Sequence, residues 1–365
     1  MKRIQFIYFN AGGGHRAAAS ALKSVIEQQG RPWEVALVNL QELLSSLDIF
    51  RKITGISLED LYNKMLARNW TLGSAFGLRI VHGAIRLYHR AMVDLLENHF
   101  RRTQPDLVVS LVPNFNRPLY QSLRGSVPYV TILTDFADYP PHFWMEKQDQ
   151  YIVCGTEKAL QQARRMGYRP EKIFAVSGMI LRPMFYQPAA VDRAAERKRL
   201  GLDPARATGI VLFGGQGSRL MPEIARRLPD TQLIFLCGHN QPLASRLRTL
   251  RRAAPHLVQG FTAEVPYYMH LADFFIGKPG PGSISEAIAM KLPVIVESNR
   301  WTLPQERYNA EWIRQQGVGL VLRSFRRIAG AVARMQENLE EFRSRAAAIH
   351  NRAVFEIPEI LSRLL

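Results

Sequence analysis

A histidine that follows three glycines is the first group along the chain with the means for acid–base chemistry. Residues 11–19, AGGGHRAAA, place His15 between an apolar run and an alanine-rich segment that is typical of a helix. The N–H groups at a helix start favour anions, and the helix dipole there lowers the pKa of an imidazole. A neutral histidine at such a position can take a proton from a hydroxyl. We expect Gly13 and Gly14 to leave room for a substrate beside His15.

The same segment also fits a dinucleotide-binding turn. Gly12, Gly14 and Ala17 satisfy its G-x-G-x-x-A form. That motif requires an acidic residue at the end of the next strand, to hold the ribose hydroxyls. The next apolar run, WEVALVNL, ends instead in Asn39 and Leu40, which disfavours a nicotinamide cofactor. A purely structural alternative is a tight turn in which His15 caps the helix.

Two further glycine-rich turns, FGGQGS and GKPGPGS, also lie between an apolar run and a helical pattern. Backbone N–H groups in such turns bind phosphate oxygens. We select these residues as candidate diphosphate ligands: Gly215, Gln216, Gly217, Ser218, Gly280, Gly282 and Ser283. Glu286 is expected in the first turn of the following helix, where its carboxylate can accept both hydroxyls of a ribose. Gln305 and Glu306, farther along in PQERYNA, can read sugar hydroxyls.

The elements that must position these residues follow from the alternation of apolar runs and helical patterns. Runs such as IQFIYF, DLVVSLV and PYVTILTD are short and rich in Val, Ile and Tyr, and the pattern restarts with GIVLFGGQGS. This alternation predicts parallel sheets with crossover helices. We therefore expect an α/β protein with two doubly wound, Rossmann-like domains facing a cleft. Ligands bind such sheets beyond the carboxyl ends of the strands, where the three glycine turns lie.

The expected domain boundaries follow the same pattern. Residues 1–182 form an N-terminal domain that is interrupted by a mostly helical insertion, 41–102. Residues 183–206, rich in Pro and Arg, are a linker, and 207–345 form the C-terminal domain. Residues 346–365 are a C-terminal helix that we expect to pack on the first domain.

Composition restricts the class of protein. The 365 residues are 47% hydrophobic and 22% charged, which is typical of a folded chain. Its two cysteines, Cys154 and Cys237, lie in apolar runs without metal-site spacing, and no run approaches the roughly 20 apolar residues of a membrane span. The apolar run after Met1 ends in glycines, so we expect no secretory signal and a cytoplasmic protein.

A net charge of +17 indicates an anionic partner, which is a nucleic acid, a bilayer surface or a phosphorylated substrate. The chain contains no helix-turn-helix, RNP-like or zinc-finger pattern, and its basic residues are spread over both domains, so we expect no nucleic acid.

The insertion contains FGLRIVHGAIRLYHRAMVDLL, which fits an amphipathic helix. Its predicted basic face contains Arg79, His82, Arg86, His89 and Arg90, and its apolar surface contains Phe76, Ile80, Leu87 and Met92. Such a helix suits an anionic membrane surface. The alternative is a solvated basic face over a buried apolar one.

Four segments together resemble the monogalactosyldiacylglycerol synthases and processive diacylglycerol glucosyltransferases, relatives of the peptidoglycan-precursor N-acetylglucosaminyltransferase. They are AGGGHRAAA, FGGQGS, GFTAEVPYYMHLADFFIGKPGPGSISEAIAMKLPVIV and PQERYNAEWI. The resemblance spans most of the chain and is most specific in the third segment. It implies the GT-B fold and the metal-free, inverting transfer of a sugar from a UDP-sugar to a lipid at a membrane.

The resemblance also implies roles for single residues. His15 takes the place of the catalytic histidine. Phe261 and Thr262 lie beside the uracil, Glu286 holds the ribose, and Gly282 with Ser283 holds the diphosphate. The acceptor-side segment TDFADYPPHFW departs from the family pattern, because His142 is farther from Asp135 and closer to Trp144 than is usual there.

These observations predict an inverting glycosyltransferase that moves a hexose from a UDP-sugar to a membrane lipid, diacylglycerol, at the inner face of the cell membrane. Its base is His15 or Asp135, and no cofactor or metal is expected. Three alternatives stay open: transfer of N-acetylglucosamine to another lipid-linked acceptor, a UDP-sugar 2-epimerase, and a non-catalytic protein that binds a UDP-sugar or a lipid.

Overall fold

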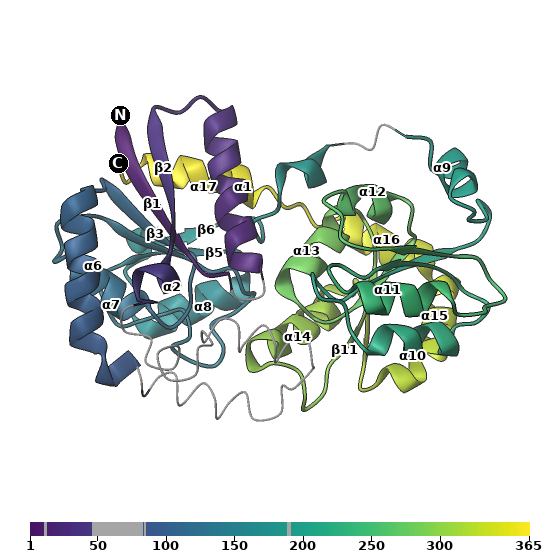
Figure 1. The fold of residues 1–365 in the computed structure, drawn as a ribbon. Coiled ribbons are helices and arrows are strands. Elements are labelled where there is room, and N and C mark those ends of the chain that lie inside the picture. The colour runs from purple at the N-terminus through teal and green to yellow at the C-terminus, as the bar shows by residue number, and fades with distance from the viewer. Residues whose placement is uncertain (11–12, 46–82, 84, 188–190) are drawn as a thin grey trace. The chain divides into compact units, whose positions relative to one another are not determined.

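The computed structural model describes residues 1–10, 13–45, 83, 85–187 and 191–365. Among these, the residues up to Pro183 and those from Asn351 onward form one compact unit, and Met184–His350 form a second. Each unit has one six-stranded parallel sheet with flanking helices (Figure 1). The predicted α/β class with two Rossmann-like domains is confirmed.

The first sheet has the strand order β2-β1-β3-β4-β5-β6, and every neighbouring pair is parallel. Its strands are β1 (Lys2–Tyr8), β2 (Trp33–Asn39), β3 (Leu107–Ser110), β4 (Tyr129–Ile132), β5 (Tyr151–Cys154) and β6 (Ile173–Ala175). The helices of this unit are α1 (Gly14–Gln28), α2 (Leu40–Leu43), α6 (His89–Thr103), α7 (Asn116–Ser122), α8 (Glu157–Met166) and α17 (Ala353–Ser362).

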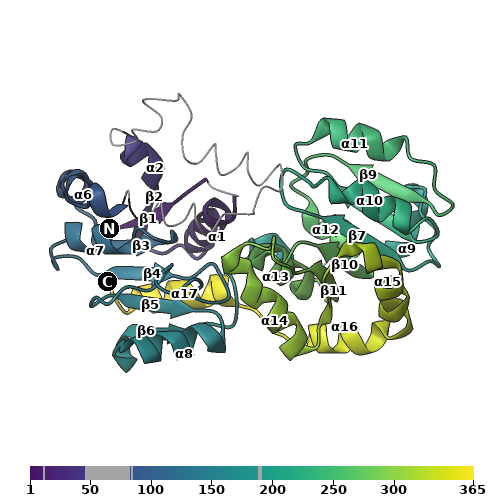
Figure 2. The same ribbon diagram turned by 90° about the horizontal axis from the view of Figure 1, so that it is seen from below.

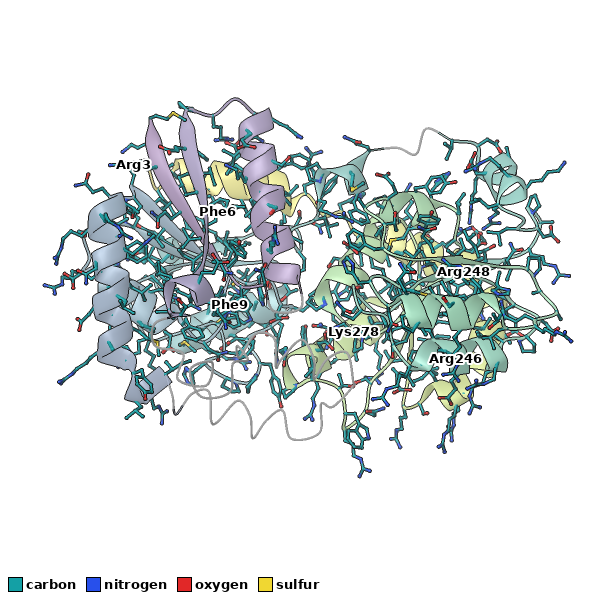
Figure 3. All side chains as sticks on the ribbon, viewed as in Figure 1. Arg3, Phe6, Phe9, Arg246, Arg248 and Lys278 are labelled. Carbon is teal, nitrogen blue, oxygen red and sulfur yellow. The ribbon has the colours of Figure 1, made fainter. Side chains whose placement is uncertain are left out.

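Helices cover both faces of this sheet, which explains why residues 4–7 of β1 are all buried. Phe6, labelled in Figure 3, is fully buried. The polar residue within this buried stretch is Gln5, whose Oε1 lies 2.9 Å from Nε2 of His99 on α6. Helix α1 packs against β1 and β2, and α17 packs on α1.

The last helix belongs to the first unit. The backbone N–H of Ser177 donates to Glu356 at 2.7 Å, and Asn351 Nδ2 donates to the carbonyl of Met179 at 2.8 Å. Arg31, after α1, forms an ion pair with Glu359 of α17. The chain therefore returns to its N-terminal unit after completing the other one.

The second sheet has the order β12-β11-β10-β7-β8-β9 and is also parallel throughout (Figure 2). Its strands are β7 (Thr208–Leu212), β8 (Gln232–Leu236), β9 (His256–Gln259), β10 (Phe274–Gly277), β11 (Val294–Glu297) and β12 (Gly319–Leu322). Its α-helices are α9 (Arg193–Arg199), α10 (Leu220–Arg227), α11 (Gln241–Arg248), α12 (Val265–His270), α13 (Pro281–Ala289), α14 (Arg307–Gln316), α15 (Ile328–Glu337) and α16 (Leu339–Ala347).

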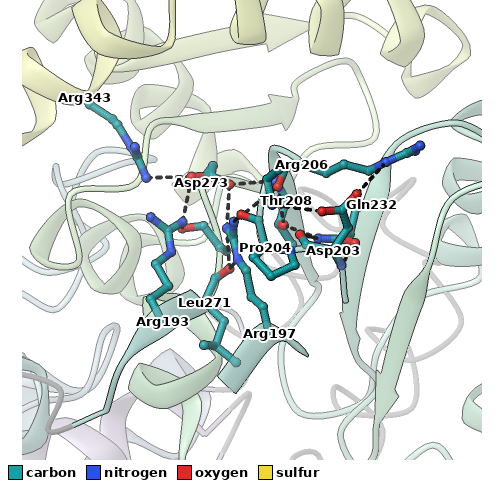
Figure 4. A network of polar contacts seen from close by, with 12 residues as sticks. Arg193, Arg197, Asp203, Pro204, Arg206, Thr208, Gln232, Leu271, Asp273 and Arg343 are labelled. Carbon is teal, nitrogen blue, oxygen red and sulfur yellow. Dashed lines mark hydrogen bonds and ion pairs between the residues drawn. The ribbon is translucent and has the colours of Figure 1, made fainter. Parts of the chain in front are cut away.

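Within the stretch expected as a linker, α9 is anchored to the second sheet through Asp273 (Figure 4). The Asp273 carboxylate accepts hydrogen bonds from Arg193 and Arg197 of α9, both at 2.6 Å, and from Arg343 of α16 at 2.9 Å. Burial alone would raise the pKa of Asp273, but the arginine charges and hydrogen bonds hold it below its ordinary value. Arg197 is itself buried, so this network fixes α9 within the second unit.

Two edge strands were missing from the sequence prediction. β6 has three residues and β12 has four, and neither has a fully buried residue. Strands this short and this exposed lack the apolar run that marks the others. Of the insertion expected at 41–102, residues 46–82 and 84 lie outside the described part. Among the helices that are described, none is long and apolar enough to cross a membrane.

Candidate active site

The first candidate site lies where the strand order of the first sheet reverses. β1 pairs with β2 on one side and β3 on the other, so the loops that leave β1 and β3 diverge. Ligands bind open α/β sheets at such a point, beyond the carboxyl ends of the strands. His15 follows β1, Leu111 follows β3 and Thr134 follows β4.

The glycines before His15 start helix α1. Gly13 is the N-cap residue with φ of 79°, a left-handed conformation that favours glycine. A Cβ at Gly13 or Gly14 would meet nothing within 4 Å, so there is open space beside both. Gly13, and not His15, is the N-cap residue, and the His15 ring contacts Thr134 and the backbone of Leu111, which contradicts the alternative that His15 caps the helix.

His15 is joined to the ends of two strands. Its Nδ1 lies 3.1 Å from Oγ1 of Thr134, and its ring centroid is 5.8 Å from that of Trp144. Burial disfavours the imidazolium and lowers the pKa of His15 to about 4, while a hydrogen bond with the backbone of Leu111 opposes this shift. The imidazole is therefore neutral at neutral pH, as the sequence predicted, but burial is the main cause.

The second candidate base, Asp135, is held by the same tryptophan. Trp144 Nε1 donates to Asp135 Oδ2 at 2.9 Å, and Asp135 is only 7% exposed. Trp144 itself has no exposed surface. We expected Trp144 on the acceptor side, whereas its indole lies in the core and contacts both candidate bases.

The loop around His142 is shaped by Asp138, which the sequence analysis missed. Its carboxylate accepts the backbone N–H groups of His142 at 3.0 Å and Trp144 at 2.6 Å. Burial raises the pKa of Asp138, and these hydrogen bonds oppose the rise. An aspartate that precedes a proline-rich turn often accepts such bonds, which was the available signal. His142 is exposed with φ of 63°, so this loop presents it to solvent.

Asn116, which the sequence analysis also missed, forms hydrogen bonds beneath the Trp144 loop that hold the site together. Its Oδ1 accepts hydrogen bonds from Ser110 and Tyr129, each at 2.7 Å. Its Nδ2 donates to the carbonyls of Val112 at 3.2 Å and Trp144 at 2.8 Å. This fully buried amide therefore links the end of β3 and the start of β4 to the loop that carries Trp144.

A hollow of about 280 Å³ lies beside this loop, lined by Arg117, Tyr120, Gln121, His142, Glu146, Lys147 and Gln148. Near it, His89 Nε2 lies 2.6 Å from Gln121 Oε1. Of the predicted amphipathic helix, Arg86 and Arg90 are exposed, as predicted for the basic face, whereas Met92 is buried, as the alternative of a buried apolar face predicts. Leu87, predicted on the apolar surface, is 77% exposed, as a membrane-facing apolar side chain would be and as the alternative of a buried apolar face does not predict. Arg79 lies outside the described residues.

Asn39, where a dinucleotide site requires an acid, has a structural role. Its Oδ1 accepts the N–H of Gln41 at 3.1 Å and so caps α2, and its Nδ2 donates to Glu42 at 2.9 Å. The side chain at the end of β2 is therefore an amide that caps α2, and not a carboxylate that could bind ribose hydroxyls.

The candidate site of the second unit also lies where the strand order reverses, between β7 and β10. The FGGQGS turn follows β7 and the GKPGPGS turn follows β10, so two glycine turns that are far apart in sequence leave neighbouring strands.

The first of these turns divides into an exposed and a buried half. Gly215 and Gln216 are exposed. Gly217 is buried with φ of 61°, and Ser218 Oγ accepts the N–H of Leu220 at 3.2 Å. Gly215 and Gln216 are therefore the better placed to meet a phosphate.

The second turn differs from the sequence expectation. Gly280 is the N-cap of α13, so Gly282 and Ser283 lie in the first helical turn and Glu286 in the second. Gly282 is exposed, and a Cβ there would meet nothing within 4 Å. The helix start therefore presents open space beside its N–H groups, which is suited to a diphosphate.

Glu306 and Lys278 form an ion pair at this edge of the sheet. Lys278 Nζ, labelled in Figure 3, lies 2.9 Å from Glu306 Oε1. Glu306 is only 7% exposed, whereas Lys278 keeps about a third of its side chain exposed. Nearby, Asn309 Nδ2 donates to the carbonyl of Pro279 at 2.8 Å and supports the glycine turn. Gln305 lies beside Glu306 and is half-buried.

Phe261 and Thr262 follow β9. The Phe261 ring is 59% exposed, an unusual position for a large apolar side chain. Thr262 Oγ1 accepts the N–H of Glu264 at 3.0 Å, which shapes the turn into α12.

No group of three His, Cys, Asp or Glu side chains with metal-binding geometry occurs within the described ranges. Burial raises the pKa of Cys154 to about 12 and that of Cys237 to about 11, so neither thiol is a reactive nucleophile at neutral pH.

Comparison with known proteins assigns a class to this fold and these loops. Residues 210–363 match the family model described as glycosyltransferase family 28 C-terminal domain. The crystal structure of MurG from Acinetobacter baumannii has the same fold, with a TM-score of 0.66 and 12% identity over the whole of both chains. The chain is a glycosyltransferase with the GT-B fold.

Within that class, the resemblance to the monogalactosyldiacylglycerol synthases is confirmed. Residues 15–179 match the monogalactosyldiacylglycerol synthase family model. The rice protein described as probable monogalactosyldiacylglycerol synthase 2, chloroplastic (Oryza sativa subsp. japonica), is 29% identical over 91% of this chain and 73% of its own length. The spinach (Spinacia oleracea) monogalactosyldiacylglycerol synthase, chloroplastic, is 27% identical over 100% of this chain and 73% of its own length. Both names place the relatives in the chloroplast, which does not match the cell-membrane location expected from the sequence.

Proposed function

We propose that this glycosyltransferase moves a hexose from a UDP-sugar to the free hydroxyl of diacylglycerol, with inversion at the anomeric carbon. One observation carries the proposal: the His15 imidazole is neutral and lies where the strand order of the first sheet reverses. There it is hydrogen-bonded to Thr134 and in ring contact with Trp144. The names of the relatives, monogalactosyldiacylglycerol synthases, support the lipid and the kind of sugar.

The proposed chemistry is one displacement. The acceptor hydroxyl gives its proton to the imidazole of His15, and its oxygen forms a bond to the anomeric carbon. The bond from that carbon to the diphosphate oxygen breaks, and UDP leaves with the electron pair. A pKa near 4 makes the free imidazole a weak base. A negative charge brought close by the donor raises that pKa, because it favours the imidazolium.

We assign the base to His15 and not to Asp135. The open space beside Gly13 and Gly14 adjoins His15, whereas Asp135 is nearly buried and its Oδ2 already accepts the Trp144 indole N–H. Asp135 is therefore a positioning residue that holds Trp144 against the imidazole.

We assign the donor to the second unit. The N–H groups at the start of α13, with those of Gly215 and Gln216, are proposed to bind the diphosphate, and Lys278 is proposed to balance its charge. Glu286 is proposed to accept the ribose hydroxyls, Phe261 and Thr262 to lie beside the uracil, and Gln305 with Glu306 to contact the sugar. No metal or other cofactor is part of this proposal.

The acceptor is proposed to come from an anionic membrane surface. Arg86 and Leu87, just before α6, and Arg90, in its first turn, are each exposed, and an exposed apolar side chain near two cations suits a lipid interface. The net charge of +17 acts in the same direction.

The test measures UDP release and lipid products together. Purified protein is given UDP-glucose, UDP-galactose or UDP-N-acetylglucosamine with anionic vesicles, with and without diacylglycerol, and lipids are analysed by mass spectrometry. We expect UDP release that depends on diacylglycerol, with a monohexosyl product. His15→Gln should lower kcat about 100- to 10,000-fold while UDP still binds, and His350→Gln, at an exposed position of the second unit, is the matched control.

Other outcomes identify the alternatives. Interconversion of UDP-sugars without lipid would indicate an epimerase, and UDP binding without turnover would indicate a non-catalytic protein. A product formed only from UDP-N-acetylglucosamine would replace the hexose in the proposal. Normal turnover by His15→Gln would remove His15 as the base.

A further inference from the structure

Two exposed aromatic rings stack on one another in the second unit. The ring centroids of His239 and Phe261 are 4.1 Å apart, and the ring planes differ by 19°. His239 lies in the loop after β8, and Phe261 lies in the loop after β9, so two carboxyl-end loops of the sheet meet in this pair. Sequence reasoning selected Phe261 alone.

The loop of His239 is locked to the FGGQGS turn. The backbone N–H of His239 donates to the carbonyl of Gly215 at 2.8 Å, and Asn240 Nδ2 donates to that of Gln216 at 3.2 Å. A Cβ at Gly238 would lie 2.1 Å from the Gly215 oxygen, so only glycine permits this approach. The His239 ring is thus mounted on a segment with a fixed position relative to the proposed phosphate ligands Gly215 and Gln216.

The spacing of the two rings decides where a ligand ring can stack. A planar base between them would need roughly 7 Å from centroid to centroid, two ordinary contact distances, and the observed spacing is 4.1 Å. One face of Phe261 is therefore covered by His239. The side chain is nevertheless 59% exposed, which leaves its other face for a ligand.

We propose that His239 is a positioning residue for the donor nucleobase: its ring holds Phe261 so that the open face of Phe261 stacks on the planar base. This inference rests on the proposed UDP-sugar donor and adds a residue that neither the motifs nor the resemblance indicated. An exposed phenylalanine without a backing ring loses rotamer freedom when a ligand binds. The His239 stack orders Phe261 beforehand, which improves affinity for the donor without touching the reacting atoms.

The experiment compares ligands with and without a base. Binding of UDP and of inorganic pyrophosphate is measured by calorimetry on the full chain, together with donor KM and kcat. Removing one ring of an aromatic pair typically weakens it enough for a three- to tenfold effect, so we expect His239→Ala to raise the Kd of UDP and the donor KM by about that factor. The kcat at saturating donor and the Kd of pyrophosphate should be unchanged. His239→Phe should restore UDP affinity, and His350→Ala is the matched control.

A spectroscopic signature tests the stack itself. The ring protons of His239 should be shifted upfield by the ring current of Phe261, should lose that shift in Phe261→Leu, and should move when UDP is added. Normal UDP affinity in His239→Ala, with UDP bound by the wild type, would overturn the inference. So would an equal loss of UDP and pyrophosphate affinity, which would locate the effect in the phosphate turn. Failure of the wild type to bind UDP would instead contradict the proposed function.

Discussion

Oγ1 of Thr134 lies 3.1 Å from Nδ1 of His15, although 119 residues separate them in the chain. The contact joins the start of α1 to the loop that follows β4. The orientation of the imidazole therefore depends on the strand order of the first sheet. It also places Thr134, which was not among the candidates from sequence, in direct polar contact with the proposed base.

Thr134 is expected to act on turnover by orienting the imidazole. Thr134→Val keeps the shape of the side chain and removes the hydrogen bond, which typically contributes about 0.5–1.5 kcal/mol. We expect kcat to fall about 2- to 12-fold while donor KM stays the same, and Thr134→Ser to retain most of the activity. Steady-state kinetics with vesicles measures both constants. Equal activity of the Val variant and the wild type would show that this contact does not support catalysis.

His15 is expected to titrate far below an ordinary histidine. Because burial lowers its pKa from 6.5 to about 4, its Cε1 proton signal should stay in the neutral position down to about pH 5 in an NMR titration, with the signal assigned through His15→Gln. The unfolded chain binds this proton more readily than the folded one. The stability that His15 contributes should therefore be complete above pH 6.5 and should decline as the pH falls toward 4. A midpoint near 6.5 would show that burial does not lower the pKa of His15.

Asn116 is expected to support the fold of the first unit. Asn116→Ala would remove the acceptor of the Tyr129 hydroxyl and the donor to the Trp144 carbonyl in a fully buried place. Loss of one partner of a buried hydrogen bond typically costs about 1–3 kcal/mol, so we expect urea unfolding, followed by tryptophan fluorescence, to show a loss of about 2–4 kcal/mol. Tyr129→Phe, which removes one hydroxyl, is the milder comparison. An Ala variant that is as stable as Tyr129→Phe would refute the linking role of the amide.

Gly282 is expected to matter for binding and not for folding. Gly282→Ala places a methyl group in open space within the first turn of α13, and alanine favours a helix by up to about 1 kcal/mol over glycine. Thermal stability should stay the same or rise, whereas UDP affinity should fall because the methyl group meets the diphosphate. Unchanged calorimetric affinity for UDP would place the diphosphate elsewhere.

Substitution of Gly238, in contrast to Gly282, is expected to lower the stability of the fold. Its φ of 59° and the 2.1 Å approach of a Cβ to the Gly215 oxygen leave no room for alanine. Gly238→Ala should destabilise the second unit by about 1–3 kcal/mol, as judged by its thermal unfolding, with a parallel loss of UDP binding. A stable Ala variant with normal affinity would mean that the two loops move apart freely.

The sequence by itself determined the class of the fold and where to look for the sites. The strands β1, β3 and β7 are rich in apolar residues because both faces of a parallel sheet are covered, and this pattern is local. The glycines at 13 and 280 start helices after strands, and this arrangement is local as well. The motifs around them are specific enough to indicate the glycosyltransferase class.

Only the tertiary structure decided which side chains meet. Asn116 and His239 lie outside the motifs, and Thr134 and Asp138 lie in the segment TDFADYPPHFW without having been selected. The importance of all four comes from partners that are distant in the chain or that a loop turns toward them. The core position of Trp144 has the same origin, since burial depends on what packs around a residue and not on its neighbours in sequence. The short edge strands β6 and β12 and the anchoring of α9 by Asp273 likewise depend on contacts made after the chain has folded. The sequence pattern shows which side chains a segment contains. The hydrogen bonds of His15, its burial and its resulting pKa depend on interatomic distances that only the folded structure sets.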